Sequence, residues 1–282
     1  YLLTTPQPET ALSLMKTHNV SYLLIDSTDL GKYSAFSSIC SDETAEDRHS
    51  WIPVMLFDPS QTKETSNKTL MIYQGGTSID DDIIYTDSNT KNQVFLPMGK
   101  AALGGILLEY STKNEEISFS HPIGAFFYDN KRYDIPIRYI YYNEKTLDLG
   151  SGINSEIMLI PAISQSAEEG VQVNKIGSLV YLSKKTKDSL FAELYLKNNK
   201  NNKYPTIKIA HVEDDFIIKS LKAQGLDFGN IVYFQGFRGP IKIWQVSYPD
   251  NIITRDEFLY KPESWNTIDG PWATLDDLKF VK

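Results

Sequence analysis

The chain has 282 residues, of which 41% are hydrophobic and 23% are charged, values that are ordinary for globular proteins and argue against extensive disorder. Its 36 acidic and 28 basic residues give a formal net charge of −8, which disfavours broad binding to nucleic acid or to anionic lipid. The only cysteine, Cys40, excludes an internal disulfide framework and a multi-cysteine zinc site, and we expect it to be a buried packing residue.

The first fifty residues predict a helix, a strand and a second helix. Pro8 to His18 has a proline in the first turn and apolar residues on one face, which predicts a helix that ends near Asn19. Val20 to Ile25 is an apolar run of strand length and predicts a buried strand. The residues from Asp26 to Asp29 offer several N-caps for the helix that follows.

From Trp51 the pattern changes to short segments rich in Tyr, Phe and Ile between polar turns, which is typical of strands. The predicted strands are Trp51 to Phe57, Lys68 to Tyr73, Ile83 to Thr86, Gly124 to Tyr128, Arg132 to Tyr142 and Glu156 to Ile160. The segment from Gly99 to Tyr110 fits a helix and a strand equally well. No window approaches the roughly 18 uninterrupted apolar residues that a transmembrane helix needs.

Helical periodicity returns near the C-terminal end. The predicted helices are Lys184 to Leu196 and Asp214 to Gln224, and the predicted strands are Thr206 to Val212, Ile231 to Phe234 and Ile241 to Val246. Helices and strands at both ends with a β-rich middle predict an α+β fold. We expect a discontinuous mixed helical and strand core made of residues 1–50 and 175–282, interrupted by a β-rich insertion of residues 51–174.

The segment Asp29-Leu-Gly-Lys32-Tyr-Ser-Ala-Phe36 places an acid and a base three residues apart on one face of the expected second helix. Together with Thr4 to Leu12 and His18 to Leu24, it resembles the soluble C-terminal domain of the oligosaccharyltransferase catalytic subunit, particularly its archaeal forms. Ser189 to Leu196 and Gly239 to Val246 look like later core segments of the same family. Enzymes of this family transfer a lipid-linked glycan to asparagine.

The resemblance implies a peptide-binding role for this helix. In the family, a short helix carries Asp-x-x-Lys followed by an apolar pair, and its residues help to line the pocket for the Ser or Thr two positions after the acceptor asparagine. Asp29 and Lys32 match this motif, while Phe36 and Ser37 stand where the commonest form has Met and Ile. Asp29, Lys32, Phe36 and Ile39 are therefore the acceptor-peptide residues that the resemblance implies.

The family's Trp-Trp-Asp-Tyr-Gly motif is not in this sequence, and we expect the chain to begin just after it. The resemblance implies part of a multi-pass membrane glycosyltransferase, attached through absent upstream helices and placed on the extracytoplasmic face of the cell membrane. The absent membrane part would bind Mn²⁺ or Mg²⁺ and the lipid-linked oligosaccharide, and the peptide with Asn-x-Ser/Thr would be the acceptor. The fragment itself is expected to contain no catalytic residue or metal ligand and to be inactive alone.

The Asp29 and Lys32 pair, the acidic clusters and the histidines also have simpler interpretations. Asp29 and Lys32 can be a surface ion pair that contributes at most about 0.5 kcal/mol. Oxygen-rich clusters at Asp80 to Asp82 and Glu213 to Asp215 could hold calcium, but neither has EF-hand spacing, so a solvated turn and helix-start charges are expected. The four histidines lack the close spacing of a zinc site.

Two further predictions concern carbohydrate. Asn67 and Asn19 lie in Asn-x-Ser/Thr patterns, and Asn67, in a polar stretch, is the better candidate for glycosylation, while Asn19 is expected to end a helix. The alternative to the transferase is a noncatalytic cell-surface or carbohydrate-binding module. It rests on the 17 Tyr, the 4 Trp and the β-rich middle, because exposed aromatic faces suit stacking against sugars.

Overall fold

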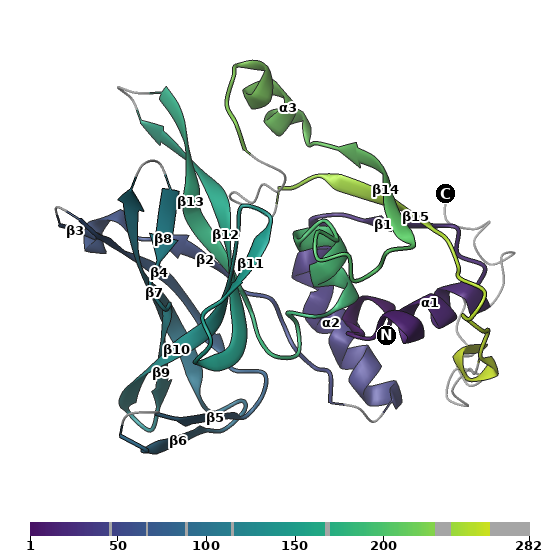
Figure 1. The fold of residues 1–282 in the computed structure, drawn as a ribbon, viewed down its shortest axis with the longest axis horizontal. Coiled ribbons are helices and arrows are strands. Elements are labelled where there is room, and N and C mark those ends of the chain that lie inside the picture. The colour runs from purple at the N-terminus through teal and green to yellow at the C-terminus, as the bar shows by residue number, and fades with distance from the viewer. Residues whose placement is uncertain are drawn as a thin grey trace, which may run out of the picture.

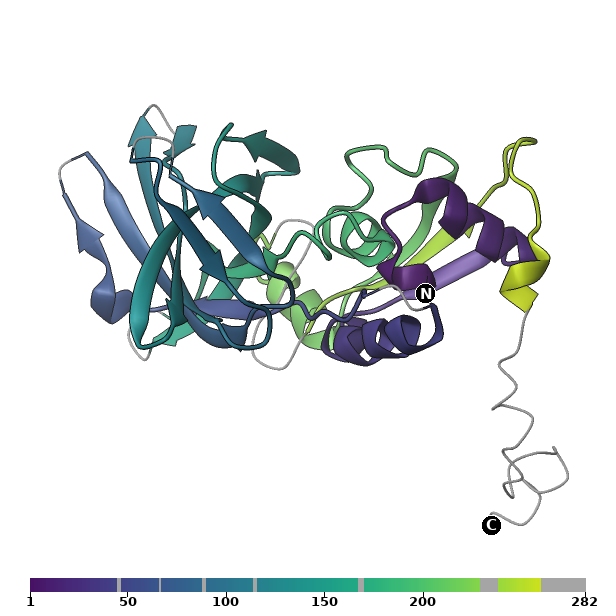
Figure 2. The same ribbon diagram turned by 90° about the horizontal axis from the view of Figure 1, so that it is seen from below.

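A computed structural model describes residues 1–44, 47–65, 67–87, 90–113, 116–166, 170–228 and 238–259. Strands make up 44% and helices 21% of the structure, and seven of the strands form a closed barrel. The barrel lies beside a smaller helical region with a three-stranded sheet (Figures 1 and 2). The predicted α+β class is therefore wrong, because the fold is closer to all-β. Several strands of the structure are longer than the predicted ones. Where the sequence predicts a helix from Lys184 to Leu196, the residues before Leu190 are mostly in turns.

The barrel closes because β4 pairs with both β2 and β7, so the order runs β4-β2-β13-β12-β10-β9-β7 and returns to β4. Its strands are β2 (Val54–Phe57), β4 (Thr69–Ser78), β7 (Ala102–Lys113), β9 (Ile123–Tyr128), β10 (Lys131–Tyr142), β12 (Ile153–Ser166) and β13 (Gly170–Leu182). All neighbours are antiparallel except β10 and β12, which are parallel. The ambiguous segment from Gly99 to Tyr110 is thus mainly strand β7.

Shorter elements decorate this barrel. They are the strands β3 (Lys63–Glu64), β8 (Glu116–Phe119) and β11 (Lys145–Asp148), the β5 (Ile83–Thr86) and β6 (Gln93–Leu96) pair, and the 3-10 turn η2 (Pro59–Gln61). Apolar residues of alternate positions fill the interior, including Met55, Leu103 and Phe126, all of which are fully buried. Gly105 allows β7 to approach β4, because a Cβ there would lie 2.8 Å from the Tyr73 carbonyl oxygen.

The N-terminal helices lie outside the barrel. They are the 3-10 turn η1 (Leu2–Thr4), α1 (Pro8–Thr17) and α2 (Thr28–Thr44), with β1 (Tyr22–Ile25) between the last two. The prediction of a helix at Pro8 to His18 is confirmed, with Pro8 in its first turn. The strand is shorter than predicted and is not fully buried, since Tyr22 and Leu24 are more than half exposed while Ile25 is buried.

The C-terminal part completes the helical region. It contains the π-helical turn η3 (Ala192–Leu196), β14 (Ile207–Glu213), α3 (Phe216–Ala223), β15 (Ile241–Val246) and η4 (Asp256–Leu259). The strands form an antiparallel sheet in the order β1-β15-β14, so segments from opposite ends of the chain pair directly, as Leu24 does with Ile243. The helix predicted at Asp214 to Gln224 is present but starts at Phe216, with Asp215 as its cap and Gly225 after it with φ of 89°. The predicted strand Ile231 to Phe234 lies outside the described residues.

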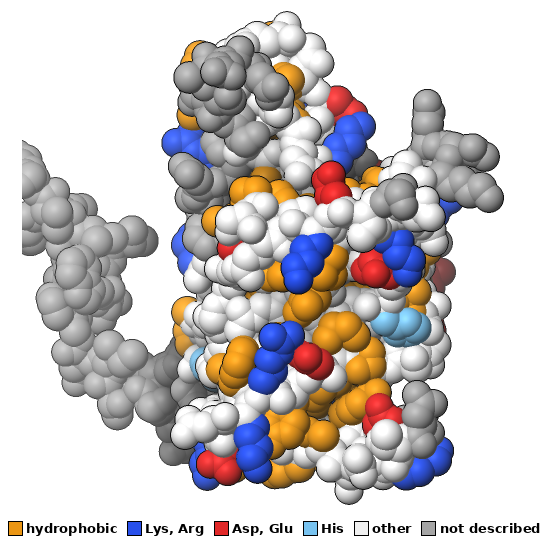
Figure 3. All heavy atoms as spheres, turned by 90° about the vertical axis from the view of Figure 1, so that its left-hand side faces the viewer, with side chains coloured by type: hydrophobic (Ala, Val, Ile, Leu, Met, Phe, Trp, Pro, Cys, Tyr) orange, Lys and Arg blue, Asp and Glu red, His pale blue; other side chains and the backbone are white. Residues whose placement is uncertain are grey.

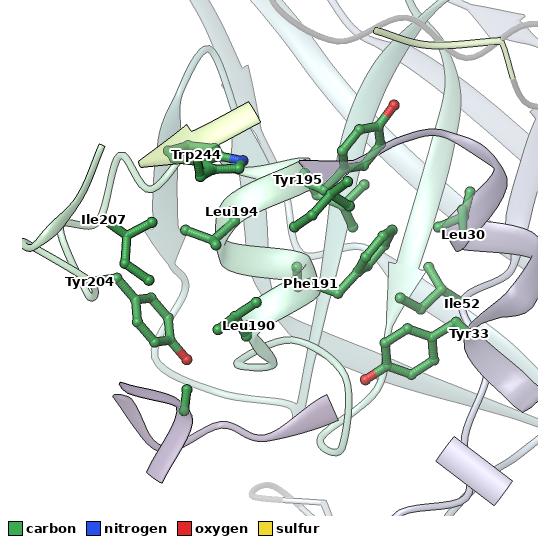
Figure 4. Close-up of a cluster of buried hydrophobic side chains, with 14 of the residues drawn as sticks. Leu30, Tyr33, Ile52, Leu190, Phe191, Leu194, Tyr195, Tyr204, Ile207 and Trp244 are labelled. Carbon is green, nitrogen blue, oxygen red and sulfur yellow. The ribbon is translucent and has the colours of Figure 1, made fainter. Parts of the chain in front are cut away.

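A second hydrophobic cluster joins segments from before and after the barrel (Figure 4). The rings of Phe191 and Tyr195 stack with their centroids 5.4 Å apart. The ring of Tyr33 in α2 packs against Phe191 with a centroid distance of 5.6 Å. Trp244 of β15 closes the other side of the cluster. Met158 and Val180 of the barrel belong to the same cluster, so the barrel is packed against the helical region. The division at residues 50 and 175 into core and insertion stays a prediction.

A buried ionic cluster also connects the two parts. The Lys197 Nζ lies 3.2 Å from Glu156 Oε2 in β12 and 3.1 Å from Glu193 Oε1 in η3, and donates to the Lys187 carbonyl oxygen at 2.8 Å. None of the three ionisable side chains is more than 3% exposed. Burial raises the pKa of Glu156 despite the nearby lysine. Burial alone would lower the pKa of Lys197, but the two carboxylates outweigh it, so this pKa is raised.

No helix within the described ranges is long and apolar enough to span a bilayer.

Replacing Lys197 with methionine should leave two buried carboxylates without their cation. We expect Lys197→Met to lower the free energy of unfolding by about 3–5 kcal/mol, measured by urea unfolding at neutral pH. Lys200→Met is the matched control, because Lys200 pairs with Glu144 at 2.7 Å in a half-exposed position and should cost less than about 1 kcal/mol. Equal effects of the two substitutions would contradict the structural role given to Lys197.

Candidate functional site

The four residues predicted to bind an acceptor peptide lie on one face of α2. Their positions, 29, 32, 36 and 39, repeat at three and four residues, so the side chains follow one another along the helix. Lys32 and Ile39 are exposed, and Asp29 and Phe36 are half-buried. The structure therefore brings Asp29, Lys32, Phe36 and Ile39 together on an accessible surface, which we call the α2 face.

Asp29 and Lys32 do not form an ion pair within the described part of the chain. Asp29 Oδ2 instead accepts a hydrogen bond from the Asp26 backbone N–H at 3.0 Å, while Asp26 Oδ1 accepts from the Thr28 backbone N–H at 2.6 Å. These bonds form a variant of the capping box at the start of the helix, in which the Asp26 side chain bonds the N–H of Thr28 and not that of Asp29. Lys32 Nζ donates to Thr28 Oγ1 at 3.1 Å and leaves its remaining donors facing solvent. The simple surface ion pair is thus not the arrangement in this structure.

The buried side of α2 fixes the rotation of the helix. Leu30 and Tyr33 are buried in the second hydrophobic cluster. Ser37 Oγ donates to the Ser50 carbonyl oxygen at 2.8 Å and accepts from the Ser50 backbone N–H at 3.0 Å, which attaches the helix to the segment that enters the barrel. Burial raises the pKa of Tyr33 to about 12. Because this side is held by packing and hydrogen bonds, the α2 face points outward. Cys40 is buried, as predicted.

A cavity of about 300 Å³ lies where α2 meets the barrel. Gly31 and Ser34 line it from the helix, and Trp51 and Thr77 line it from the barrel side. Trp51 Nε1 donates to Thr77 Oγ1 at 2.6 Å and is fixed in this position. The four predicted residues are not among its lining. No sequence pattern associates Trp51 with α2, because their proximity depends on the barrel.

The two sequon asparagines are both exposed. Asn67 lies in the turn that precedes β4, as expected for a glycosylation acceptor. Asn19 follows α1 with φ of 54°, a left-handed conformation that asparagine tolerates at helix ends, so it ends the helix as predicted. Modification of either residue stays a prediction.

The acidic clusters differ from each other. Glu213 pairs with His211 and Lys219, Asp214 pairs with Lys222, and Asp215 caps α3, so the second cluster consists of helix-start charges as predicted. Within the described ranges, no three His, Cys, Asp or Glu side chains are grouped to hold a metal ion.

The predicted solvated turn at Asp80 to Asp82 is wrong for its first residue. Asp80 is buried, and its carboxylate accepts a hydrogen bond at 2.6 Å from Ser183 of the segment after β13, whereas Asp82 is exposed.

Comparison with known proteins does not identify the chain. No protein family, no curated protein and no solved structure matches it. The interpretation of the α2 face therefore depends on its own chemistry and on the sequence resemblance.

Lys242 is a buried ionisable residue that no sequence pattern indicates. Lys242 of β15 is 1% exposed, and its Nζ donates to the Tyr195 carbonyl oxygen and to Asn198 Oδ1, both at 2.6 Å. Burial lowers the pKa of Lys242 to about 7, and the nearby carboxylate of Asp214 only partly opposes this. Its carbonyl partner belongs to the last turn of η3, so Lys242 caps that turn from the sheet.

The low pKa of Lys242 predicts a pH dependence of stability. Its pKa falls from 10.5 in the unfolded chain to about 7 in the folded one, so between these values the unfolded state binds more protons and stability rises with pH. Relative to Lys242→Met, the natural chain should gain about 2 kcal/mol of unfolding free energy between about pH 7 and pH 9. Urea unfolding at the two pH values measures this difference. The control is Lys208→Met, an exposed substitution in the neighbouring strand β14. If Lys242→Met changed the pH dependence of the unfolding free energy no more than Lys208→Met does, the pKa assigned to Lys242 would be contradicted.

Proposed function

We propose that this chain is the extracytoplasmic C-terminal domain of an oligosaccharyltransferase catalytic subunit, in which the α2 face helps to recognise the Ser or Thr of an Asn-x-Ser/Thr acceptor. The observation that carries the proposal is the shared, accessible placement of Asp29, Lys32, Phe36 and Ile39. These are the positions that the sequence resemblance associates with the acceptor. Their common face and the absence of an internal ion pair among them support a role in binding.

The chemistry of the α2 face suits a hydroxyl-bearing side chain. Lys32 has ammonium donors free for a hydroxyl oxygen, and its alkyl stem can lie along the peptide. Phe36 and Ile39 supply apolar surface one and two turns further along, where the methyl group of threonine can pack. Asp29 acts through the capping box, which holds the first turn of the helix in place.

Such a surface contributes to transfer by positioning. Holding the acceptor in one orientation removes part of the entropic barrier to the reaction. A site whose polar group pairs with a hydroxyl discriminates against a side chain that lacks it, because the group is left without a partner. Bond making itself belongs to the parent enzyme, whose membrane part would hold Mn²⁺ or Mg²⁺ and the lipid-linked oligosaccharide, so this domain alone is expected to be inactive.

The alternative, a noncatalytic carbohydrate-binding module, rests on exposed aromatic residues of the barrel. Phe95 and Phe127 are about half exposed. The ring of Phe127, however, packs over Gly104 on the adjacent strand. A Cβ at position 104 would lie 2.5 Å from this ring, so the ring covers the glycine and has a packing role in the sheet. On the barrel face in Figure 3, hydrophobic side chains are interspersed with charged ones. These observations favour the α2 face over a flat aromatic platform.

Photo-crosslinking to the full-length parent tests the location of the acceptor. We expect an Asn-x-Thr peptide with a photoreactive group beside the threonine to form adducts near Lys32, and an Asn-x-Ala peptide to form far fewer. Adducts confined to residues 51–174, or adducts that do not depend on the hydroxyl, would contradict the proposal and favour the binding module.

A substitution tests the role of Lys32. Lys32→Ala in the full-length parent should weaken binding of the acceptor peptide by about tenfold, the value of one lost charge-assisted hydrogen bond, as measured by fluorescence anisotropy of a labelled peptide. Lys131→Ala, an exposed lysine on the barrel, is the matched control and should leave the affinity unchanged. Peptide affinity equal to that of the natural enzyme in the Lys32 variant would remove this residue from the acceptor site.

A further inference from the structure

A larger cavity, of about 490 Å³, is lined by residues of the barrel and its connections and by no residue of α2. Three parts of the chain meet there: the connection from β4 into β5, the start of β12, and the residues at the end of β13. Its volume falls within the range of small-molecule sites. The walls come from three separate parts of the chain, so no single loop forms the cavity.

Four polar side chains of this cavity, those of Asp80, Ser155, Tyr181 and Ser183, are buried and hydrogen bonded. Asp80, 6% exposed, accepts a hydrogen bond from Ser183 Oγ at 2.6 Å. Tyr181 Oη donates to Ser155 Oγ at 3.0 Å in the same lining, where both residues are buried. A buried carboxylate is costly to keep in a fold, and its presence in a cavity is typical of a binding or catalytic site.

The electrostatics of Asp80 support the same conclusion. Burial raises the pKa of Asp80 to about 6, although the hydrogen bond from Ser183 and the charge of Lys185 oppose the rise. The carboxylate therefore remains mostly ionised at neutral pH and is a strong hydrogen-bond acceptor with little competing water.

The lining alternates donors and acceptors with apolar surface. Asp80 and Asp81 are acceptors, Asn154 both donates and accepts, and Lys184 supplies a cation 3.9 Å from Asp81. Tyr85, half-buried on β5, contributes an aromatic ring. An anionic ligand would be repelled by the carboxylates, and a purely apolar one would shield Asp80 and Asp81 from water without offering them hydrogen bonds. No three ligand side chains in the described ranges are grouped to hold a metal ion.

We propose that this cavity is a saccharide-binding site, in which Asp80 accepts hydrogen bonds from sugar hydroxyls and Tyr85 packs against a sugar ring. A sugar offers several hydroxyls that both donate and accept, which matches the mixed lining, and it carries C–H faces that suit an aromatic ring. The cavity and the α2 face share no residue, so this inference goes beyond the proposed function and does not depend on it.

Binding to defined sugars tests the inference. The full chain is titrated with methyl glycosides of glucose, galactose, mannose and N-acetylglucosamine and with their disaccharides, using saturation-transfer NMR followed by calorimetry. We expect at least one sugar to bind and Asp80→Asn to weaken its binding by about tenfold or more, because a hydrogen bond to a charged acceptor is lost. Asp129→Asn, an exposed turn residue of the barrel with φ of 51°, is the matched control and should bind normally.

Further outcomes decide against the inference. Binding of no sugar, or sugar binding that is unchanged in Asp80→Asn, overturns it, and so does binding of 1,6-diaminohexane in place of every sugar. If Asp80→Asn fails to fold by circular dichroism, Tyr85→Ala decides in its place, since Tyr85 is only half-buried: sugar binding must weaken there too. The peptide experiments at Lys32 use another surface, so the two proposals fail independently.

Discussion

The Lys197 ammonium group lies between carboxylates that come from different parts of the fold, Glu156 from the barrel and Glu193 from η3. Isolated, each of these charges would cost several kcal/mol to bury. Together they require β12 and η3 to keep one spacing, because the Nζ lies within 3.2 Å of both carboxylates. The hydrophobic contacts around them, such as those of Met158 and Phe191, tolerate small shifts more readily than this cluster does. The position of η3 relative to the barrel therefore depends on Lys197.

The orientation of α2 depends on η3 in turn. Phe191 immediately precedes η3 and contacts Tyr33, while Ser37 is hydrogen bonded to the backbone of Ser50. These contacts occupy one side of α2 and leave the side with Lys32 and Ile39 outward. Lys242 reaches the same turn from the sheet through the Tyr195 carbonyl oxygen. The α2 face is thus presented by a chain of contacts that begins in the barrel wall, which gives the barrel a structural role in acceptor recognition if the proposed function holds.

Local signals in the sequence were sufficient for elements whose limits are set locally. Pro8 in the first turn and the spacing of Ala11, Leu12 and Met15 define α1, and the apolar alternation of Ile241 to Val246 defines β15. The fold class could not be predicted in this way. It depends on the pairing of β4 with β7, which closes the barrel and decides that the ambiguous segment near Ile106 is a strand. No short-range pattern reports that pairing, because its partners, from Ser78 with Ala102 to Thr69 with Tyr110, lie far apart in the sequence.

The same distinction applies to the sites. Spacing predicts that Asp29 and Lys32 share a helix face, and the resemblance adds Phe36 and Ile39, but only the fold shows that this face is accessible. Spacing also makes Asp80 to Asp82 look like a solvated turn, whereas the fold buries Asp80 against Ser183, a residue more than one hundred positions later in the chain. The barrel register sets the distance between these two residues, and the packing of α2 sets the accessible face. Because the two surfaces rest on different constraints, a substitution at Asp80 that preserves the barrel should leave the α2 face intact, and a substitution at Lys32 should leave the cavity intact.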